Sequence, residues 1–138
     1  MFIENASWTE KMHQSMPYTC YLGILAGTLN NQFTLKLPYR EMLVGNVMLP
    51  AIHGGVISGF LESCILVHTQ HVLSLEKIPQ PIDFSLDYLR AGRPLDCYAQ
   101  ALIKRQGRRV SSVEVKAWQD AAQKEIAIGR ASLLMPEM

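Results

Sequence analysis

The chain has 138 residues, which is enough for one domain with its own hydrophobic core and too few for a second domain of ordinary size. Hydrophobic residues make up 49% and charged residues 18%, so the composition is globular and not disordered. The formal net charge of +1 gives no reason to expect a nucleic acid or a membrane surface as partner. We therefore expect residues 1–138 to form a single domain.

Three cysteines, Cys20, Cys64 and Cys97, are far apart and odd in number, so they indicate neither a disulfide framework nor a zinc site. His68 and His71 are three positions apart, but no third ligand accompanies them, and we expect no metal and no other cofactor. The N-terminal segment lacks the apolar stretch of a signal peptide, which favours a cytoplasmic protein.

The first part of the chain predicts a short helix and a hairpin. Ser7 and Glu10 have the spacing of a capping box, with Ser7 as the N-cap of a helix that reaches about Met16 and is ended by Pro17. Asn30-Asn31 tolerates the positive φ of a tight turn between two strands. We expect two strands and then a loop with a short turn, over Tyr21–Leu29, Gln32–Leu37 and Pro38–Pro50.

The segment from Gly54 to about His71 is the longest predicted helix. Apolar side chains cover most of its circumference, and such a helix belongs inside a protein. The alternation of apolar and polar residues then predicts four strands, over Pro81–Leu89, Leu95–Lys104, Val110–Trp118 and Glu125–Leu134. About six strands curled around one helix bury that helix on all sides, so we predict an α+β fold.

Several short motifs occur in a distinctive order along the chain. They are Gly45-Asn46, His53-Gly54-Gly55-Val56, Glu62 nine positions after His53, the strand DFSLDYLRAGR over 83–93 and the segment GRRVSSVEVKAWQD over 107–120. This set, spread over roughly Leu22 to Leu134, resembles the PaaI-type acyl-CoA thioesterases of the 4-hydroxybenzoyl-CoA thioesterase-like superfamily. The resemblance implies a hotdog fold, in which an antiparallel sheet wraps around one long central helix.

The start of the predicted helix is the first candidate site. A helix N-terminus presents unpaired N–H groups with a partial positive charge, and Gly54 and Gly55 carry no side chain to keep a substrate away. Both N–H groups can donate hydrogen bonds to a thioester carbonyl oxygen, which gains negative charge during attack. From the residues alone, a tight turn into the helix explains the two glycines equally well, and the resemblance favours the site.

Glu62 is the second candidate, because an acid is seldom buried in so apolar a helix unless it is paired. A carboxylate there can act as a general base on water or as the nucleophile itself, and the resemblance implies one of these two roles. The alternative is a solvated acid on the one wet stripe of the helix, near Ser58.

The spacing of these two candidates bears on oligomeric state. Gly54 and Glu62 are eight positions apart, which is about 12 Å along an α-helix. One helix therefore does not bring both groups to one carbonyl carbon, whereas two antiparallel copies related by a two-fold axis do. The resemblance implies the same pairing of Gly54 or Gly55 with Glu62 of the other chain, so we expect a homodimer that assembles further into a homotetramer.

The resemblance adds two candidate site residues that come before the predicted helix. Asn46 matches a position that is implied to orient the water or the acid, although His53 follows it by seven positions where relatives often have six. His53 is expected to orient the loop by hydrogen bonding and not to act as a base. Relatives often carry Ser or Thr shortly before the position of Asp83, and Pro79-Gln80-Pro81 stands there instead.

Coenzyme A carries phosphates, and its binding requires cations. Arg90, Arg93, Arg108 and Arg109 stand at predicted strand ends and turns, where bidentate phosphate contacts are geometrically easy. Each of them, taken singly, is equally well explained as a solvated surface residue. Arg90 belongs to the Tyr-Leu-Arg motif of the resemblance and is the strongest candidate.

These residues predict hydrolysis of an acyl-CoA thioester to free acid and CoA. The carbonyl is polarised by Gly54 and Gly55, and Glu62 of the partner chain is base or nucleophile. The alternative is a non-catalytic acyl-CoA or acyl-lipid binding protein, because one fold hosts several functions. A hotdog dehydratase is disfavoured, since the chain lacks the His-containing FPG-type loop of that group. The sequence does not indicate the acyl group.

Overall fold

The computed structural model of the protein describes residues 1–45, 48 and 50–137. Its strands are β1 Ile3–Glu4, β2 Leu25–Leu29, β3 Gln32–Leu37, β4 Gln80–Tyr88, β5 Cys97–Arg105, β6 Val110–Trp118 and β7 Glu125–Leu134. Its helices are α1 Ala6–Ser15, α2 Pro17–Leu22 and α3 Gly54–Val72, with a short 3₁₀ helix, η1, at Glu41–Leu43. Among the described residues, no helix is long and apolar enough to span a membrane.

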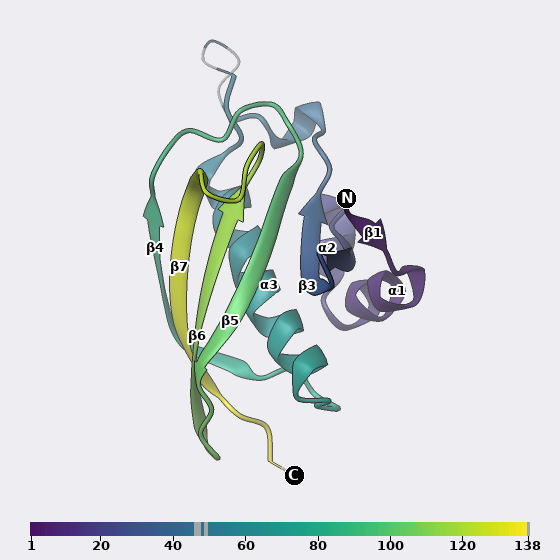
Figure 1. The fold of residues 1–138 in the computed structure, drawn as a ribbon, viewed down its shortest axis with the longest axis vertical. Helices are drawn as coiled ribbons and strands as arrows, with labels where there is room; N and C mark the ends of the chain where they lie inside the picture. Colours follow the sequence, from purple (N-terminus) through teal and green to yellow (C-terminus); the bar gives the residue numbers. More distant parts are fainter. Residues whose placement is uncertain (46–47, 49, 138) are drawn as a thin grey trace.

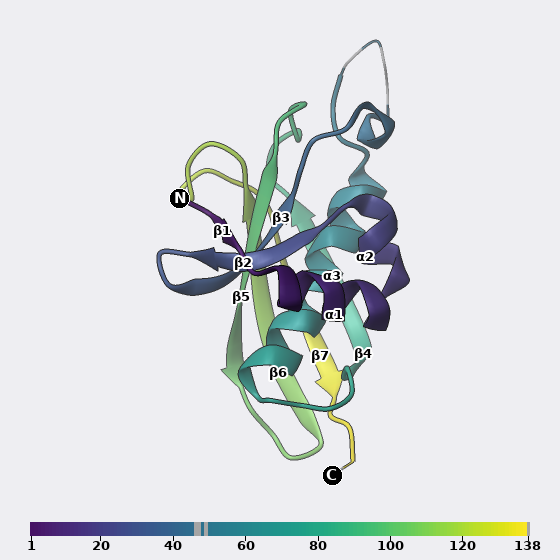
Figure 2. The ribbon, with the colours of Figure 1, turned by 90° about the vertical axis from the view of Figure 1, so that its right-hand side faces the viewer.

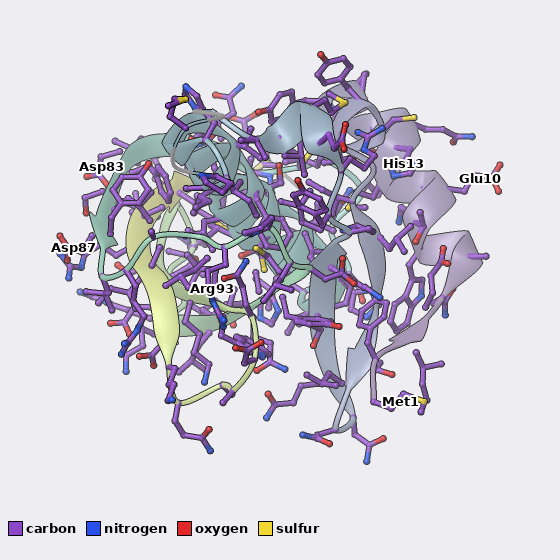
Figure 3. All side chains as sticks on the ribbon, turned by 90° about the horizontal axis from the view of Figure 1, so that it is seen from above. Met1, Glu10, His13, Asp83, Asp87 and Arg93 are labelled. Atoms are coloured by element: carbon purple, nitrogen blue, oxygen red, sulfur yellow. The ribbon has the colours of Figure 1, made fainter. Side chains whose placement is uncertain are left out.

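The described strands form one antiparallel sheet in the order β1-β2-β3-β5-β6-β7-β4. Helix α3 lies against one face of this sheet, and α1 and α2 lie on the same side (Figure 1 and Figure 2). Seen from above, β4 with Asp83 and Asp87 lies at one side of the molecule and α1 with Glu10 and His13 at the other (Figure 3). One sheet with its helices on one face confirms the predicted α+β class.

Helix α3 forms the centre of the core. Phe60, Leu61, Cys64 and Ile65 are 0% exposed. They pack in one cluster with buried residues of the sheet, which include Leu35, Ala99, Ala117 and Leu133. Burying a Phe, Leu or Ile side chain stabilises a fold by roughly 1.5–3 kcal/mol, so the packing of this helix against the sheet contributes strongly to the core's stability. The predicted helix from Gly54 to about His71 is confirmed.

The N-terminal segment differs from the prediction in two respects. The N-cap of α1 is Asn5, whose side chain accepts a hydrogen bond from the Trp8 N–H at 3.1 Å, so the predicted capping box at Ser7 is wrong. Pro17 does end α1, but it also begins α2, because the first helical position needs no N–H from its residue. The strand predicted from Tyr21 therefore begins only at Leu25.

The hairpin and the C-terminal strands follow the prediction more closely. Asn30 and Asn31 both have positive φ, at 52° and 64°, as the tight turn requires. Strands β6 and β7 have the predicted bounds, while β4 and β5 are displaced from theirs by one or two residues at each end. The short strand β1 was not predicted, because two residues are too few to show a period of two.

Candidate active site

The start of α3 leaves one backbone donor open. His53 is the N-cap, and its Nδ1 accepts a hydrogen bond from the Gly55 N–H at 2.9 Å. The Val56 N–H donates to the His53 carbonyl at 2.9 Å. Among the described residues, the Gly54 N–H has no partner. Of the two N–H groups proposed from the sequence, the one at Gly54 is open to a ligand and the one at Gly55 is held by His53.

Tyr88, at the end of β4, fixes the opposite side of Gly54. Its hydroxyl donates a hydrogen bond to the Gly54 carbonyl oxygen at 2.7 Å. A Cβ on Gly54 would lie 3.3 Å from that hydroxyl oxygen, so the glycine permits this close approach. No role was predicted for Tyr88, although its place in the Tyr-Leu-Arg motif is a signal that the sequence carries. It ties the helix start to the edge strand.

Gly55, which is exposed, and the half-buried Ser58, Gly59 and Glu62 form a stripe along the first turns of α3. These residues share one face because positions three and four apart are neighbours on a helix. Glu62 is therefore not fully buried in one chain, and it stands beside Ser58 as the alternative interpretation expected. A Cβ on Gly59 would lie only 2.6 Å from the ring of Tyr18, which shows that α2 packs closely against the side of this stripe.

The connection from β4 to β5 carries Arg90 and Arg93 to the end of the molecule where α3 begins (Figure 1). The Ile52 N–H donates to the Gly92 carbonyl at 2.9 Å, so this connection touches the segment just before the helix. Arg90 donates through Nε to the Glu125 carbonyl at 3.1 Å. Arg93 forms an ion pair with Asp120. The backbone of this connection is therefore next to the segment before α3, and the Arg93 side chain is already paired.

Arg108 and Arg109 lie between β5 and β6, at the opposite end of the sheet (Figure 1). Both residues are exposed. Within one chain, the four arginines proposed from the sequence therefore fall into two pairs at opposite ends, and only the pair at Arg90 and Arg93 accompanies Gly54. Asn46, the remaining residue proposed for the site, lies outside the described residues.

The buried thiols offer no competing nucleophile. Burial raises the pKa of Cys64 far above its ordinary value. Burial also raises the pKa of Cys97 to about 11, against the opposing effect of a hydrogen bond from the Gln119 side chain. Both groups are therefore protonated thiols at neutral pH, and only a thiolate is strongly nucleophilic. Within the described residues, no group of three or more His, Cys, Asp or Glu is placed to hold a metal ion.

Comparison with known proteins assigns the family. Residues 46–134 match the family model described as the acyl-CoA thioesterase N-terminal domain. The chain belongs to the acyl-CoA thioesterase family. This match takes in the start of α3, Glu62 and the strands from β4 to β7. No curated protein matches the sequence.

Solved structures agree with this assignment. A protein of Chromobacterium violaceum is 33% identical, with a TM-score of 0.78 over 96% of this chain and 93% of that one. The E. coli PaaI protein from the phenylacetic acid degradation operon is 16% identical, with a TM-score of 0.78 over 96% and 93%. Mouse thioesterase superfamily member 2 is 16% identical, with a TM-score of 0.75 over 95% and 96%. The latter two share the fold, so the predicted hotdog fold is confirmed, and the family match confirms the predicted thioesterase family. Membership of this thioesterase family supports thioester hydrolysis in general.

Proposed function

We propose that this protein hydrolyses acyl-CoA thioesters, with the Gly54 N–H as the donor that polarises the thioester carbonyl. The N–H at the start of a 19-residue helix, which has no partner among the described residues, carries this proposal. It combines a free hydrogen bond with the positive end of the helix dipole, and both stabilise a developing oxyanion. The hydrogen bond from Tyr88 to the Gly54 carbonyl keeps the donor in place. The Gly55 N–H joins the site only if His53 turns away.

The second component is Glu62 from another copy of the chain. Within one helix Glu62 lies about 12 Å along the axis from Gly54, too far to meet the same carbonyl. Strand β4 stands at one edge of the described sheet and exposes Ile82 by 57% and Tyr88 by 53%. An edge strand that exposes these apolar side chains and contacts the start of α3 through Tyr88 suits a two-fold pairing with the same strand of a second copy. We therefore propose that the active unit is a homodimer of single-domain chains, assembling further into a homotetramer.

The chemistry then follows from the charge of Glu62. As a general base, its carboxylate takes a proton from water while the water oxygen bonds to the carbonyl carbon. The resulting oxyanion is held by the Gly54 N–H, and its collapse expels the CoA sulfur, which takes up the proton. As a nucleophile, the carboxylate bonds to the same carbon and expels the thiolate, and water then hydrolyses the acyl anhydride. Arg90 is the first candidate for the CoA phosphates and Asn46 for orienting the water.

Exchange of subunits between two inactive variants tests the dimeric site. Gly54→Pro removes the proposed donor while suiting the first helical position, and His53 has φ −56° and ψ 132°, which a following proline accepts. Glu62→Gln removes the proposed base. A mixed dimer of the two variants contains one intact site, so random mixing is expected to restore about a quarter of wild-type turnover. No recovery in confirmed mixed dimers contradicts a site shared between chains.

Two controls separate the parts of this proposal. Gly54→Ala keeps the N–H but adds a Cβ next to Tyr88, so it reports the steric part of the effect of Gly54→Pro. Wild-type protein assayed on acyl-CoAs of varied length and aromaticity tests the activity itself. Binding without turnover across that panel contradicts the enzyme and supports an acyl-CoA binding protein on the same fold.

A further inference from the structure

Tyr18 lies on α2, on the same side of the sheet as α3 (Figure 2), and its ring reaches the first half of that helix. A Cβ on Gly59 would lie 2.6 Å from Cε2 and 2.9 Å from the hydroxyl oxygen of Tyr18, so the ring rests directly on the glycine. Tyr18 nevertheless remains 45% exposed. Its ring is therefore open to contact with a molecule that lies along the stripe to which Gly59 belongs.

Hydrogen bonds near both ends of α2 fix the backbone from which this ring extends. Thr19 is 0% exposed, and its hydroxyl donates a hydrogen bond to the Met16 carbonyl at 2.7 Å, just before the helix. Towards the other end, Arg40 donates to the Tyr21 carbonyl at 2.6 Å. A side chain that extends from an anchored helix onto a second helix is a defined boundary for a ligand, because moving it requires breaking these contacts. Tyr18 is such a boundary.

The proposed reaction sets the direction in which an acyl group runs from Gly54. Its carbonyl is held at the Gly54 N–H, and the CoA side leaves toward Arg90, at the end of the molecule where α3 begins (Figure 1). The acyl group is attached to the other side of the carbonyl carbon, so it extends along α3 toward Gly59. Gly59 is five positions after Gly54, which is about 7.5 Å along the helix. With carbon–carbon bonds of about 1.5 Å, an extended chain advances roughly 1.25 Å per carbon and reaches Tyr18 after about six carbons.

We propose that Tyr18 is a specificity-determining residue that limits the acyl group to about six carbons. This inference rests on the proposed function, because it requires a thioester carbonyl at the Gly54 N–H. From Gly55 to Gly59 the stripe carries only glycine and serine, which leave room for a short chain. A longer chain has to displace a ring that already rests on the helix. A boundary that admits or excludes a single methylene discriminates by about 10–200-fold, so the limit is expected to be sharp.

Hydrolysis of butanoyl-, hexanoyl- and decanoyl-CoA by the full-length protein tests the inference. For wild type, kcat/KM is expected to fall by about tenfold or more from hexanoyl- to decanoyl-CoA. Tyr18→Ala removes the ring and is expected to raise the ratio of decanoyl- to hexanoyl-CoA kcat/KM by about tenfold. Tyr18→Phe keeps the ring and is expected to keep the wild-type ratio. Equal kcat/KM for both substrates in wild type, or an unchanged ratio in Tyr18→Ala, overturns the inference while the proposed function stands.

Tyr98→Ala is the matched control, because it makes the same truncation on the face of the sheet that points away from α3. Ala99 is buried in the core cluster with α3, and neighbouring residues of a strand point to opposite faces. Tyr98→Ala is therefore expected to keep the wild-type ratio, and a change as large as that in Tyr18→Ala overturns the specific role of Tyr18. Circular dichroism confirms that each variant is folded.

A change in the opposite direction keeps the inference testable if Tyr18→Ala does not fold. Tyr18→Trp enlarges the ring and is expected to lower the ratio of hexanoyl- to butanoyl-CoA kcat/KM. An unchanged ratio in the folded variant overturns the inference.

Binding of ketone analogues separates the inference from the proposed function. In these analogues a methylene replaces the thioester sulfur of hexanoyl- or decanoyl-CoA, so the carbonyl is kept and hydrolysis is blocked. If wild type hydrolyses none of the acyl-CoAs, the proposed function fails. Weaker binding of the decanoyl analogue by about tenfold, relieved in Tyr18→Ala, then still supports Tyr18 as the boundary of an acyl-CoA binding site. Equal affinity for the two analogues overturns the inference as well.

Discussion

The two ends of α3 belong to one apolar helix, yet they differ in what each leaves without a hydrogen bond. At the first residue the unpartnered group is a backbone N–H, on Gly54, in a segment held by Tyr88 and capped by His53. In the last turns, the buried side-chain atoms without a partner among the described residues are Nδ1 of His68 and Oγ1 of Thr69. The first end is a donor with the helix dipole behind it. At the second end the His68 ring is neutral at pH 7, because burial, with a smaller contribution from His71, lowers its pKa to about 4.

The two ends of α3 also differ in the interactions that hold them in place. The start of α3 is fixed mainly by hydrogen bonds from its cap and from Tyr88. The other end is fixed by aromatic packing, because Phe33 stacks on His71 with centroids 4.6 Å apart and Trp8 meets the His71 ring at 4.3 Å. We therefore expect substitutions at the first end to change turnover and substitutions at the second end to change stability.

The largest effect is expected at Glu62. Glu62→Gln keeps the size of the side chain but removes the charge that activates water, so kcat is expected to fall by about 10²–10⁴. The measurement is steady-state hydrolysis of an accepted acyl-CoA. Glu10→Gln makes the same change on the exposed surface of α1, far from β4 (Figure 3), and is expected to leave kcat as it is. Retained turnover in Glu62→Gln shows that Glu62 is only a solvated residue of the stripe.

The next largest effect tests the aromatic end. Trp8→Ala removes ring contacts with Phe33 and His71 and is expected to lower the free energy of unfolding by about 2–3 kcal/mol, somewhat less than for a fully buried Trp. Urea denaturation measures this change. Turnover per folded molecule is expected to be retained, because the ring contacts of Trp8 are with Phe33 and with His71, at the other end of α3 from Gly54. A large loss of kcat in the folded variant contradicts the separation of the two ends.

The helix and strands could be predicted where the sequence carries a local periodic pattern. The apolar circumference of α3 and the alternation in β6 and β7 are periodic over many residues, and their predicted bounds agree with the structure. In the N-terminal segment a strand was predicted from Tyr21 where the structure has the end of α2, because Tyr21 and its neighbours favour strands. The local signals for a helix were nevertheless present, with Pro17 at its first position and Gly23 at its end in the left-handed region, at φ 76°.

The site was predicted as a set of residues but not as a set of contacts. The sequence shows His53, Gly54 and Gly55 in order, but it does not show that Nδ1 of His53 turns back onto the Gly55 N–H. His68 lines an opening in the sheet that depends on where β3 and β5 stop pairing, and these strands are about sixty residues apart in the chain. Such long-range pairing leaves no local pattern, so the second end of α3 was beyond sequence reasoning.

A smaller effect on stability is expected from lowering the pH, through His68 near the C-terminal end of α3. The pKa of His68 is lowered from its ordinary value of 6.5 to about 4 in the folded protein. The unfolded chain therefore takes up a proton between these values while the folded chain does not, so stability present above pH 6.5 is lost as pH falls toward 4. We expect His68 to contribute about 2 kcal/mol to this loss, after allowance for its partial exposure.

The difference between wild type and His68→Phe isolates that contribution, because both proteins share all other acid-sensitive groups. Urea denaturation at pH 7 and at pH 4.5 measures it. The pKa of His71 is also lowered, first by burial and then by Lys11, so part of the acid loss remains in the variant. An identical loss of stability in the two proteins shows that His68 is accessible to protons and not held neutral by burial.

The smallest effect is expected at the cap of α3. His53→Ala removes the acceptor for the Gly55 N–H and is expected to lower the free energy of unfolding by about 1 kcal/mol. His53→Asn keeps an acceptor at the N-cap position and is expected to recover most of that loss. Denaturation of the two variants in parallel checks this, since they differ from each other mainly in the hydrogen bond. If both are as stable as wild type, the Gly55 N–H is not held by His53 in solution, and Gly54 and Gly55 are then equivalent donors at the start of the helix.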